Sequence, residues 1–304
     1  MLNSARYFLL DVFTSQRFGG NQLAIFPDAN DFTERQMSTI ARELQLSETV
    51  FVIQPKDKNN HYGMRIFTPQ MELPTAGHPT IGTSFFMVRY INFDEEIDHI
   101  DLSIEQQVGI INAKVNVEKG IPVFSSMYQP LPEFIKTIDN KKDFARMLSV
   151  EENAIGDTPI EVISCGVPFT FIPIRSLALI KEVKLNVTIW EEMKERYGIS
   201  FIYVFTTETE NPDHHVHGRM FAPEAGIAED AATGAANGPL GCYLYKHNAI
   251  EQSEDNATLI SEQGFEMGRP SLIHIEITEE EGKINQVKIG GHSVLIGQGQ
   301  IFLD

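Results

Sequence analysis

The chain has 304 residues and a mass of 34.2 kDa, a length that suits two domains better than one core. Its 24 basic and 42 acidic residues give a net charge of −18, which argues against nucleic acid and against an anionic membrane surface as partners. Two cysteines exclude a disulfide framework and a four-cysteine zinc site. The longest apolar helix candidate, residues 81–93, is too short to span a bilayer, and the N-terminus lacks the apolar segment of a signal peptide, so we predict a cytoplasmic protein.

The first half of the chain alternates between strand patterns and two helical segments. A capping box at Thr33–Gln36 predicts a helix whose apolar face carries Met37, Ile40 and Ala41. A second helix is expected from about Pro79 to Phe93, with the proline at the first helical position. Strands are predicted at 6–14, 22–26, 48–54 and 64–68, and several more between 100 and 127, including 108–111 and 114–117.

The second half repeats this scheme. A helix is expected from about Ala232 to His247. Strands are predicted at 161–164, 169–174, 199–205, 215–221, 258–261, 272–278, 284–289 and 293–302. Because strands outnumber helices and no regular helical crossovers separate them, the pattern favours an α+β fold over a doubly wound parallel sheet.

An internal repeat links the two halves. The segment Arg65-Ile66-Phe67-Thr68-Pro69 matches Arg219-Met220-Phe221-Ala222-Pro223. In each half a glutamate then precedes a glycine by five positions, Glu72 before Gly77 and Glu229 before Gly234. Upstream, residues 20–26 parallel residues 166–172 in the same order. We therefore predict duplicated domains at 1–128 and 129–304, with a last strand that can return to the first domain.

Two turns of small residues, 75–80 and 231–236, stand at the expected starts of the central helices. The first turn of a helix leaves backbone N–H groups without partners inside the helix, and the helix dipole adds a partial positive charge there. If the duplicated domains bring both turns to one cleft, together they could hold a carboxylate-bearing substrate.

The titratable residues near these turns are Glu48, His78 and Asp230. Each also has an ordinary structural explanation: a solvated charge at a strand end, a satisfied turn residue and a helix-cap or dipole partner. Glu48 opens a strongly apolar run, where partial burial would raise its pKa toward that of a useful base. The matching stretch 199–203 has no acid, which suggests a single asymmetric site in a duplicated scaffold.

Six segments carry a specific resemblance. They are Asp11–Thr14, Phe18–Ala24, Leu46–Phe51, Ala76–Thr80, Glu229–Gly234 and Gly268–Ser271. In kind and in order they resemble the signature stretches of the phenazine-biosynthesis PhzF-like family, and they cover nearly the whole chain. The resemblance implies a diaminopimelate-epimerase-like fold: two pseudo-symmetric domains, each a curved, mostly antiparallel sheet around a central helix, with the active site between them.

The resemblance also implies cofactor-free isomerisation by proton transfer. It further implies that the protein is a homodimer and acts in a biosynthetic process. Glu48 would take a proton from one substrate carbon and return it at another, while His78 and Asp230 would orient the substrate and share the proton traffic. The substrate site would be lined by Ser47, Gly77, Thr233 and Gly234, and by the backbone N–H of Ala235. The chain departs from the family pattern at Ala231, where proline is frequent, and at Ala235, where serine is frequent. Loss of that serine hydroxyl puts the phenazine-pathway substrate in doubt.

Two other chemistries are weighed against this one. Racemases of the related fold use paired thiols, but Ala76 and Ala231 stand at the equivalent positions. Cys242 is expected in the core and Cys165 in a strand turn.

The run His214-His215-x-His217 does not provide a converging ligand set, so we interpret it as an exposed strand entry and expect neither metal nor cofactor. The leading hypothesis is thus a cofactor-independent isomerase of a small carboxylate-bearing metabolite. The alternatives are a non-catalytic binding protein on the same scaffold and, third, a racemase or epimerase.

Overall fold

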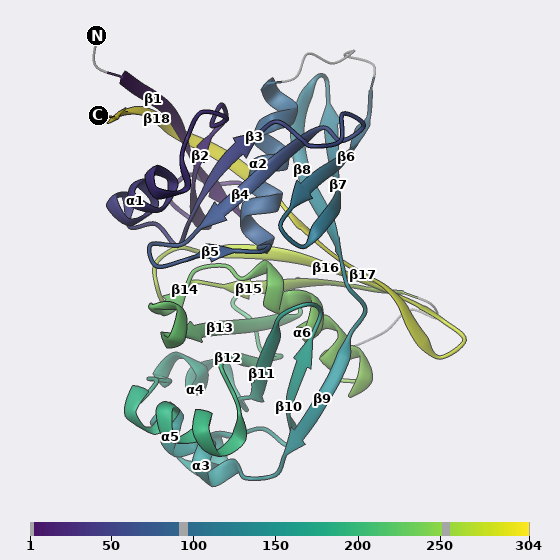
Figure 1. Ribbon diagram of the computed structural model, residues 1–304. Helices are drawn as coiled ribbons and strands as arrows, with labels where there is room; N and C mark the ends of the chain where they lie inside the picture. Colours follow the sequence, from purple (N-terminus) through teal and green to yellow (C-terminus); the bar gives the residue numbers. More distant parts are fainter. Residues whose placement is uncertain (1–2, 91–96, 251–255, 304) are drawn as a thin grey trace. The chain divides into compact units, whose positions relative to one another are not determined.

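The computed structural model describes residues 3–90, 97–250 and 256–303. The chain divides into two compact units, which are described separately (Figure 1). Unit 1 comprises Met1–Tyr128 with Gly290–Asp304, and unit 2 comprises Gln129–Ile289. No helix within the described ranges is long and apolar enough to cross a membrane.

Unit 1 is a mixed sheet built around one helix. Its strands are β1 (Asn3–Val12), β2 (Asn21–Phe26), β3 (Glu48–Ile53), β4 (Tyr62–Phe67), β5 (Glu72–Leu73), β6 (His99–Gln106), β7 (Gly109–Glu118), β8 (Ile121–Gln129) and β18 (Ser293–Leu303). β2 runs parallel to β3 and β4 runs parallel to β6, while the pairs β18–β1, β1–β2, β3–β4, β4–β5, β6–β7 and β7–β8 are antiparallel. The helices are α1 (Glu34–Leu44) and α2 (Gly77–Tyr90).

Unit 2 has the same plan with a larger helical insertion. Its strands are β9 (Glu133–Ile138), β10 (Ile160–Ser164), β11 (Pro168–Pro173), β12 (Phe201–Thr206), β13 (Val216–Ala222), β14 (Ile227–Asp230), β15 (Asn256–Gln263), β16 (Ser271–Glu280) and β17 (Lys283–Gly291). The helices are α3 (Lys141–Leu148), α4 (Leu177–Glu182), α5 (Val187–Tyr197) and α6 (Gly234–Lys246). The order of pairings from β10 to β16 repeats that from β1 to β7, including the parallel pairs β11–β12 and β13–β15.

A central helix fills each unit. Residues 77–86 of α2 are all buried, and α2 packs against β1, β2, β3 and β7 of its own sheet. α6 is equally apolar around its circumference and packs against the corresponding strands β10, β11 and β16. A helix that is hydrophobic on every side belongs in a core rather than on a surface. The small residues at both helix starts therefore lie in buried parts of the molecule.

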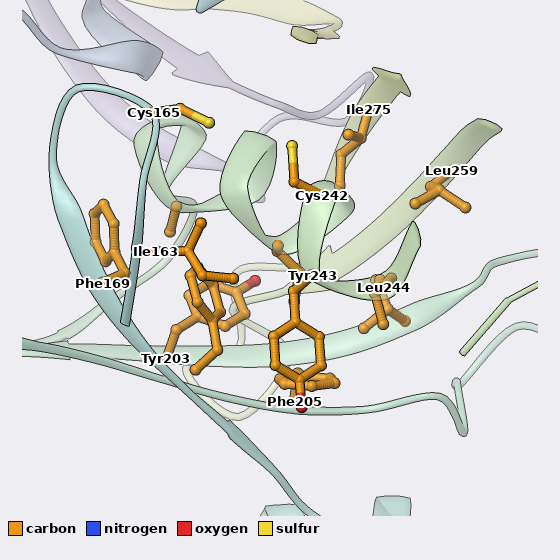
Figure 2. Close-up of a cluster of buried hydrophobic side chains, with 14 of the residues drawn as sticks. Ile163, Cys165, Phe169, Tyr203, Phe205, Cys242, Tyr243, Leu244, Leu259 and Ile275 are labelled. Atoms are coloured by element: carbon orange, nitrogen blue, oxygen red, sulfur yellow. The ribbon is translucent and has the colours of Figure 1, made fainter. Parts of the chain in front are cut away.

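The core of unit 2 gathers aromatic and aliphatic side chains around α6 (Figure 2). Cys242 and Cys165 both belong to this cluster and are buried. Contact with Cys165 and burial raise the pKa of the Cys242 thiol far above its ordinary value. The core placement predicted for Cys242 is confirmed, and a thiol in this setting is a poor candidate for a reactive thiolate.

Most predicted elements are confirmed within a few residues, with several corrections. The capping box at Thr33 is present, but α2 starts at Gly77, so Pro79 is the third helical residue rather than the first. The last part of the predicted helix, 91–93, lies outside the described residues. α6 starts at Gly234 instead of Ala232, and the two strands expected at 108–111 and 114–117 form the single strand β7. The elements β5, β9, β14, α3, α4 and α5 were not predicted.

The repeated arginine forms the same salt bridge in both units. Arg65 on β4 donates from Nε and Nη2 to the two carboxylate oxygens of Glu72 on β5, at 2.7 and 2.6 Å. Arg219 on β13 makes the same bidentate pair with Glu229 on β14, at 2.8 and 2.9 Å. Each guanidinium also lies over the phenylalanine two residues later, 5.1 Å from the ring centroid in unit 1 and 5.2 Å in unit 2. The sequence repeat thus corresponds to a repeated three-dimensional motif.

The two copies of this salt bridge differ in burial, which predicts different contributions to stability. The Arg219 side chain is 8% exposed and also donates to the carbonyls of Ile180 and Val183, whereas Arg65 is 25% exposed. We expect Arg219→Met to lower the free energy of unfolding by about 3 kcal/mol, because it leaves a carboxylate and two buried carbonyls without their donor. Arg65→Met should lower it by about 1 kcal/mol or less. Urea unfolding of both variants tests this, and equal losses would contradict it.

Candidate active site

The unit 1 part of the candidate site pairs Glu48 with His78. Glu48 is the first residue of β3 and His78 is the second residue of α2, and both are buried, with 9% and 4% of their surfaces exposed. His78 Nε2 lies 3.3 Å from Glu48 Oε2. Two residues far apart in the chain are thus brought into contact by the packing of the central helix on the strand.

Asn21 and Ser47 extend this pair into a chain of polar contacts. Asn21, the first residue of β2, places its amide nitrogen 3.3 Å from His78 Nδ1, and its Oδ1 accepts a 2.9 Å hydrogen bond from the Ser47 hydroxyl. The Asn21 amide therefore joins the Ser47 hydroxyl to the imidazole of His78. Ser47 was predicted as a site residue, whereas no role was assigned to Asn21.

Burial controls the charge of His78. Desolvation lowers the pKa of the imidazole to about 3, although a hydrogen bond with the Gln22 backbone acts in the opposite direction. The ring is therefore neutral at physiological pH, and its close approach to Glu48 is not an ion pair. A neutral ring beside Glu48 adds no positive charge to the site.

The unit 2 part of the candidate site centres on Asp230, the last residue of β14. Its Oδ2 accepts a 2.6 Å hydrogen bond from the hydroxyl of Thr233, the residue that precedes α6. Thr233 N–H donates to Gln263 Oε1 at 3.1 Å, so this amide is already used inside the protein. The N–H of Ala236 likewise donates to the carbonyl of Thr233 at 3.1 Å, so neither of these two amides at the helix start is open to a ligand. Gly234 and Ala235 follow as the first two residues of α6.

Strand register shows which positions of the two repeat copies correspond to each other. β3–β4 aligns Thr49 with Phe67, and β12–β13 aligns Ile202 with Phe221, the repeat partner of Phe67. The unit 2 position that corresponds to Glu48 is therefore occupied by Phe201. Counting from the repeated glycines, Ala235 corresponds to His78, Leu73 to Asp230 and Ala76 to Thr233. Each unit thus carries polar groups that the other lacks.

The histidine run 214–217, which leads into β13, is involved in structural contacts. His217 is fully buried between Glu262 and Glu266, and His214 contacts Glu262. His215 accepts a hydrogen bond from the backbone N–H of Ile260. The interpretation of this run as an exposed strand entry is wrong for His217. Among the residues that the structure describes, no group of three or more His, Cys, Asp or Glu side chains is placed to hold a metal ion.

Comparison with known proteins identifies the relatives of this chain. A model of the phenazine biosynthesis-like protein family matches residues 10–299. The chain is 33% identical over 297 residues to a trans-2,3-dihydro-3-hydroxyanthranilate isomerase of Pseudomonas chlororaphis, covering 98% of this chain and 99% of that protein. A crystal structure of a Bacillus anthracis phenazine biosynthesis protein of the PhzF family superposes with a TM-score of 0.89 at 26% identity, covering 99% of this chain and 100% of the other.

A more distant neighbour shares the fold. A hydroxyproline epimerase from Agrobacterium vitis superposes with a TM-score of 0.68 at 13% identity, covering 100% of this chain and 94% of the other. The predicted α+β fold of the epimerase type is therefore confirmed, as is the resemblance stated from the sequence motifs. The predicted enzyme class, isomerase, is the one that the relatives' names carry. The chain belongs to the phenazine biosynthesis-like protein family.

Proposed function

We propose that this protein is a cofactor-independent isomerase that moves a proton within a small carboxylate-bearing metabolite. The carboxylate of Glu48 takes a proton from one substrate carbon as that C–H bond breaks. The electron pair shifts along the adjacent unsaturated system, and the same carboxyl group returns the proton at another carbon. The substrate gains and loses no atoms, so the reaction needs no oxidant, reductant or second substrate.

The observation that carries this proposal is the contact between Glu48 and a neutral His78 inside a buried part of unit 1. A base that must take and return a proton has to hold it near the reacting carbons, and shielding from water favours that. The neutral imidazole lies against the carboxylate, with Nε2 3.3 Å from Glu48 Oε2, while Asn21 and Ser47 hold the imidazole in place. None of these groups carries a competing positive charge.

Asp230 and Thr233 complete the proposed site from unit 2. Glu48 and His78 exist in one copy of the repeat, and Asp230 and Thr233 in the other, which supports one asymmetric site served by both units. In this proposal the backbone N–H groups of Gly77, Gly234 and Ala235 receive the substrate carboxylate. Asp230 orients a polar group of the substrate.

Deuterium exchange tests the proposal. The protein is incubated in D₂O with trans-2,3-dihydro-3-hydroxyanthranilate, the compound named for its relatives, and separately with a panel of unsaturated carboxylates. We expect loss of a carbon-bound ¹H signal and deuterium incorporation in at least one compound, because the proton taken up by Glu48 exchanges with solvent deuterons while the deprotonated substrate is bound, before it is returned to carbon. No exchange in any compound, together with measurable binding, would favour a non-catalytic binding protein on the same scaffold.

A racemase is the weaker alternative. Thiol-dependent racemisation requires thiolates on both sides of a substrate carbon, and Cys165 and Cys242 are both buried in the apolar core of unit 2. The raised pKa of Cys242 also disfavours a thiolate. Proton transfer by a carboxylate is therefore the function that the described side chains support best.

A further inference from the structure

A glutamine occupies the same place in both copies of the repeat. β4 pairs in parallel with β6 so that Gly63 aligns with Glu105, and β13 pairs with β15 so that His217 aligns with Glu262. Gly63 and His217 both stand two residues before the repeated arginine. The next residues on β6 and β15, Gln106 and Gln263, are therefore equivalent. Both side chains reach the start of the central helix of their own unit.

In unit 1 this glutamine makes limited contacts. Gln106 Nε2 donates to the Thr80 hydroxyl at 2.8 Å and contacts Met64 Sδ at 3.6 Å. Thr80 in turn donates to the carbonyl of Ala76 at 2.7 Å. Gln106 Oε1 is buried and has no hydrogen-bond donor among the described residues. The glutamine in unit 1 therefore steadies the helix start through its nitrogen alone.

In unit 2 both ends of the amide are used, and the backbone decides which end is which. Gln263 Nε2 lies 2.8 Å from the carbonyl oxygen of Asp230, which can only accept a hydrogen bond. Gln263 Oε1 lies 3.1 Å from the backbone N–H of Thr233, which can only donate. The orientation of the amide is therefore fixed by its partners and cannot be reversed without losing both bonds.

This orientation fixes the direction of the next hydrogen bond. The second hydrogen of Gln263 Nε2 points to the Thr233 hydroxyl oxygen at 2.9 Å. The hydroxyl therefore accepts from Gln263, and its own hydrogen is directed to Asp230 Oδ2 at 2.6 Å. Gln263 and the two residues it controls are all at least nine-tenths buried. The chain runs in one direction, from the amide through the hydroxyl to the carboxylate.

Two neighbours of Gln263 differ from their counterparts in unit 1 in a way that supports this arrangement. Tyr203 on β12 donates its hydroxyl to Gln263 Oε1 at 3.3 Å, where Val50 stands in unit 1. Gly218 on β13 leaves the room that the Tyr203 ring fills, since a Cβ there would lie 2.4 Å from that ring. Its unit 1 counterpart is Met64. Unit 2 thus adds a donor and removes a side chain around the same glutamine.

We propose that Gln263 is a positioning residue of the isomerase site: it holds the Thr233 hydroxyl so that its hydrogen bonds Asp230 and keeps that carboxylate in one orientation. Gln263 does not touch the substrate and acts through Thr233. This role rests on the function proposed above for Asp230. The hydrogen-bond chain itself is a property of unit 2 and can be tested without turnover.

The charged and titratable groups around Asp230 stay constant in the variants that test this role. The elements packed around Asp230 carry Tyr203 on β12, His217 and Arg219 on β13, Glu229 on β14 and Glu262 on β15, with Glu266 after β15. None of them is changed when Gln263 is replaced by Met or Thr233 by Val. A change in the titration of Asp230 between variants therefore reports the lost hydrogen bond.

The experiment is a double-mutant cycle with Gln263→Met, Thr233→Val and the double variant, read by ¹³C NMR titration of the Asp230 carboxyl carbon and by kcat. Each single variant should raise the titration midpoint of Asp230, because the ionised form loses a donor. Each should lower kcat by about 10²-fold, as expected when a substrate-orienting group is misplaced by about 1 Å. The double variant should match the singles, since both break one chain. Thr233→Ser, which retains the hydroxyl, should restore the wild-type midpoint.

Gln106→Met is the matched control, because it removes the equivalent amide from unit 1 and should leave the Asp230 midpoint unchanged. If Gln263→Met does not fold, the wild-type protein still provides a test. The Thr233 hydroxyl proton should exchange slowly with solvent and show a nuclear Overhauser effect to the Gln263 side-chain amide. Additive effects in the cycle, an unchanged Asp230 midpoint or a freely exchanging hydroxyl would each overturn the role of Gln263. Absence of turnover in the wild type would instead count against the proposed function.

Discussion

Replacing Glu48 by glutamine is expected to lower kcat by 10²–10⁴-fold, the range typical for removal of a general acid or base. Gln is nearly isosteric with Glu and fits beside His78, but it cannot take a proton at neutral pH. Binding of the substrate should persist, so KM should change much less than kcat. Steady-state kinetics on the compound identified by deuterium exchange, with the exchange rate itself as a second readout, measures both quantities.

The repeat offers a matched control for this variant. Phe201 occupies the Glu48 position in unit 2, and Phe201→Leu changes a partly buried residue there without touching a titratable group. It should leave the proton-transfer step intact. If Glu48→Gln retains most of the wild-type kcat, the base lies elsewhere and the assignment of Glu48 fails. If kcat and deuterium exchange are lost but binding persists, the variant has removed the chemistry alone.

The parts of this fold that follow from local patterns were predictable from the sequence. Period-two alternation identified most strands, and the capping box identified α1 because its two reciprocal hydrogen bonds depend on residues only three positions apart. The repeat was visible because Arg65 and Arg219 keep a bidentate partner at a short sequence distance. These features require no knowledge of how distant segments meet.

The helical insertion of unit 2 was missed although its signals were present. α3 follows an asparagine cap at Asn140 and buries Phe144, Met147 and Leu148, and α5 follows a second cap at Asn186. These segments have no counterpart in the repeat, apart from the single helix α1 between β2 and β3. The repeat therefore gives no indication of these helices, which have to be predicted from their own caps and periodicity.

The contacts of Asn21 and Gln263 could not be predicted because they depend on strand register. Neither side chain is titratable. The role of each depends on the groups it contacts across the sheet, which are the His78 ring for Asn21 and the backbone of Thr233 and Asp230 for Gln263. One signal existed for Gln263: the dipeptides Glu105-Gln106 and Glu262-Gln263 end equivalent strands. The sequence similarity at these strand ends indicates that the two glutamines are equivalent. The directions of their hydrogen bonds follow only from the three-dimensional structure.

The same duplicated strand end carries an acid that is fully buried in unit 2, as Glu262, and only partly buried in unit 1, as Glu105. Glu105 accepts from the backbone N–H groups of Lys56 and Asp57, and Glu262 accepts in the same way from Glu210 and Asn211. Only in unit 2 does a histidine face this acid at the position of Gly63: His217 Nδ1 lies 2.8 Å from Glu262, and its Nε2 lies 3.0 Å from Glu266. His217 and Glu262 are fully buried.

This arrangement keeps His217 charged. Burial by itself would lower the pKa of the imidazole, but hydrogen bonds to Glu262 and Glu266 outweigh it and raise the pKa to about 9. Burial likewise opposes ionisation of Glu262, yet hydrogen bonds from His217 and from the Glu210 and Asn211 backbones lower its pKa to about 2. Because the pKa of His217 is raised above its ordinary value of 6.5, its stabilising contribution is complete below pH 6.5 and is lost as the pH rises through about 9. The contribution of Glu262 is present above pH 4.5 and is lost as the pH falls toward 2.

We therefore expect His217→Gln to lower the free energy of unfolding by about 3–5 kcal/mol between pH 5 and 6, because the buried carboxylate of Glu262 and the partly buried one of Glu266 lose the cation between them. The deficit should shrink as the pH rises from 6.5 through 9, where the wild type itself loses that cation. Urea unfolding at half-unit pH intervals measures this, and hydrogen exchange of β13 and β15 amides localises it to unit 2. Glu105→Gln, which changes the equivalent acid of unit 1 without a histidine partner, should show no such pH dependence above pH 6.5. Parallel stability curves for the wild type and His217→Gln from pH 5 to 9.5 would show that folding does not raise the pKa of His217, which would contradict this prediction.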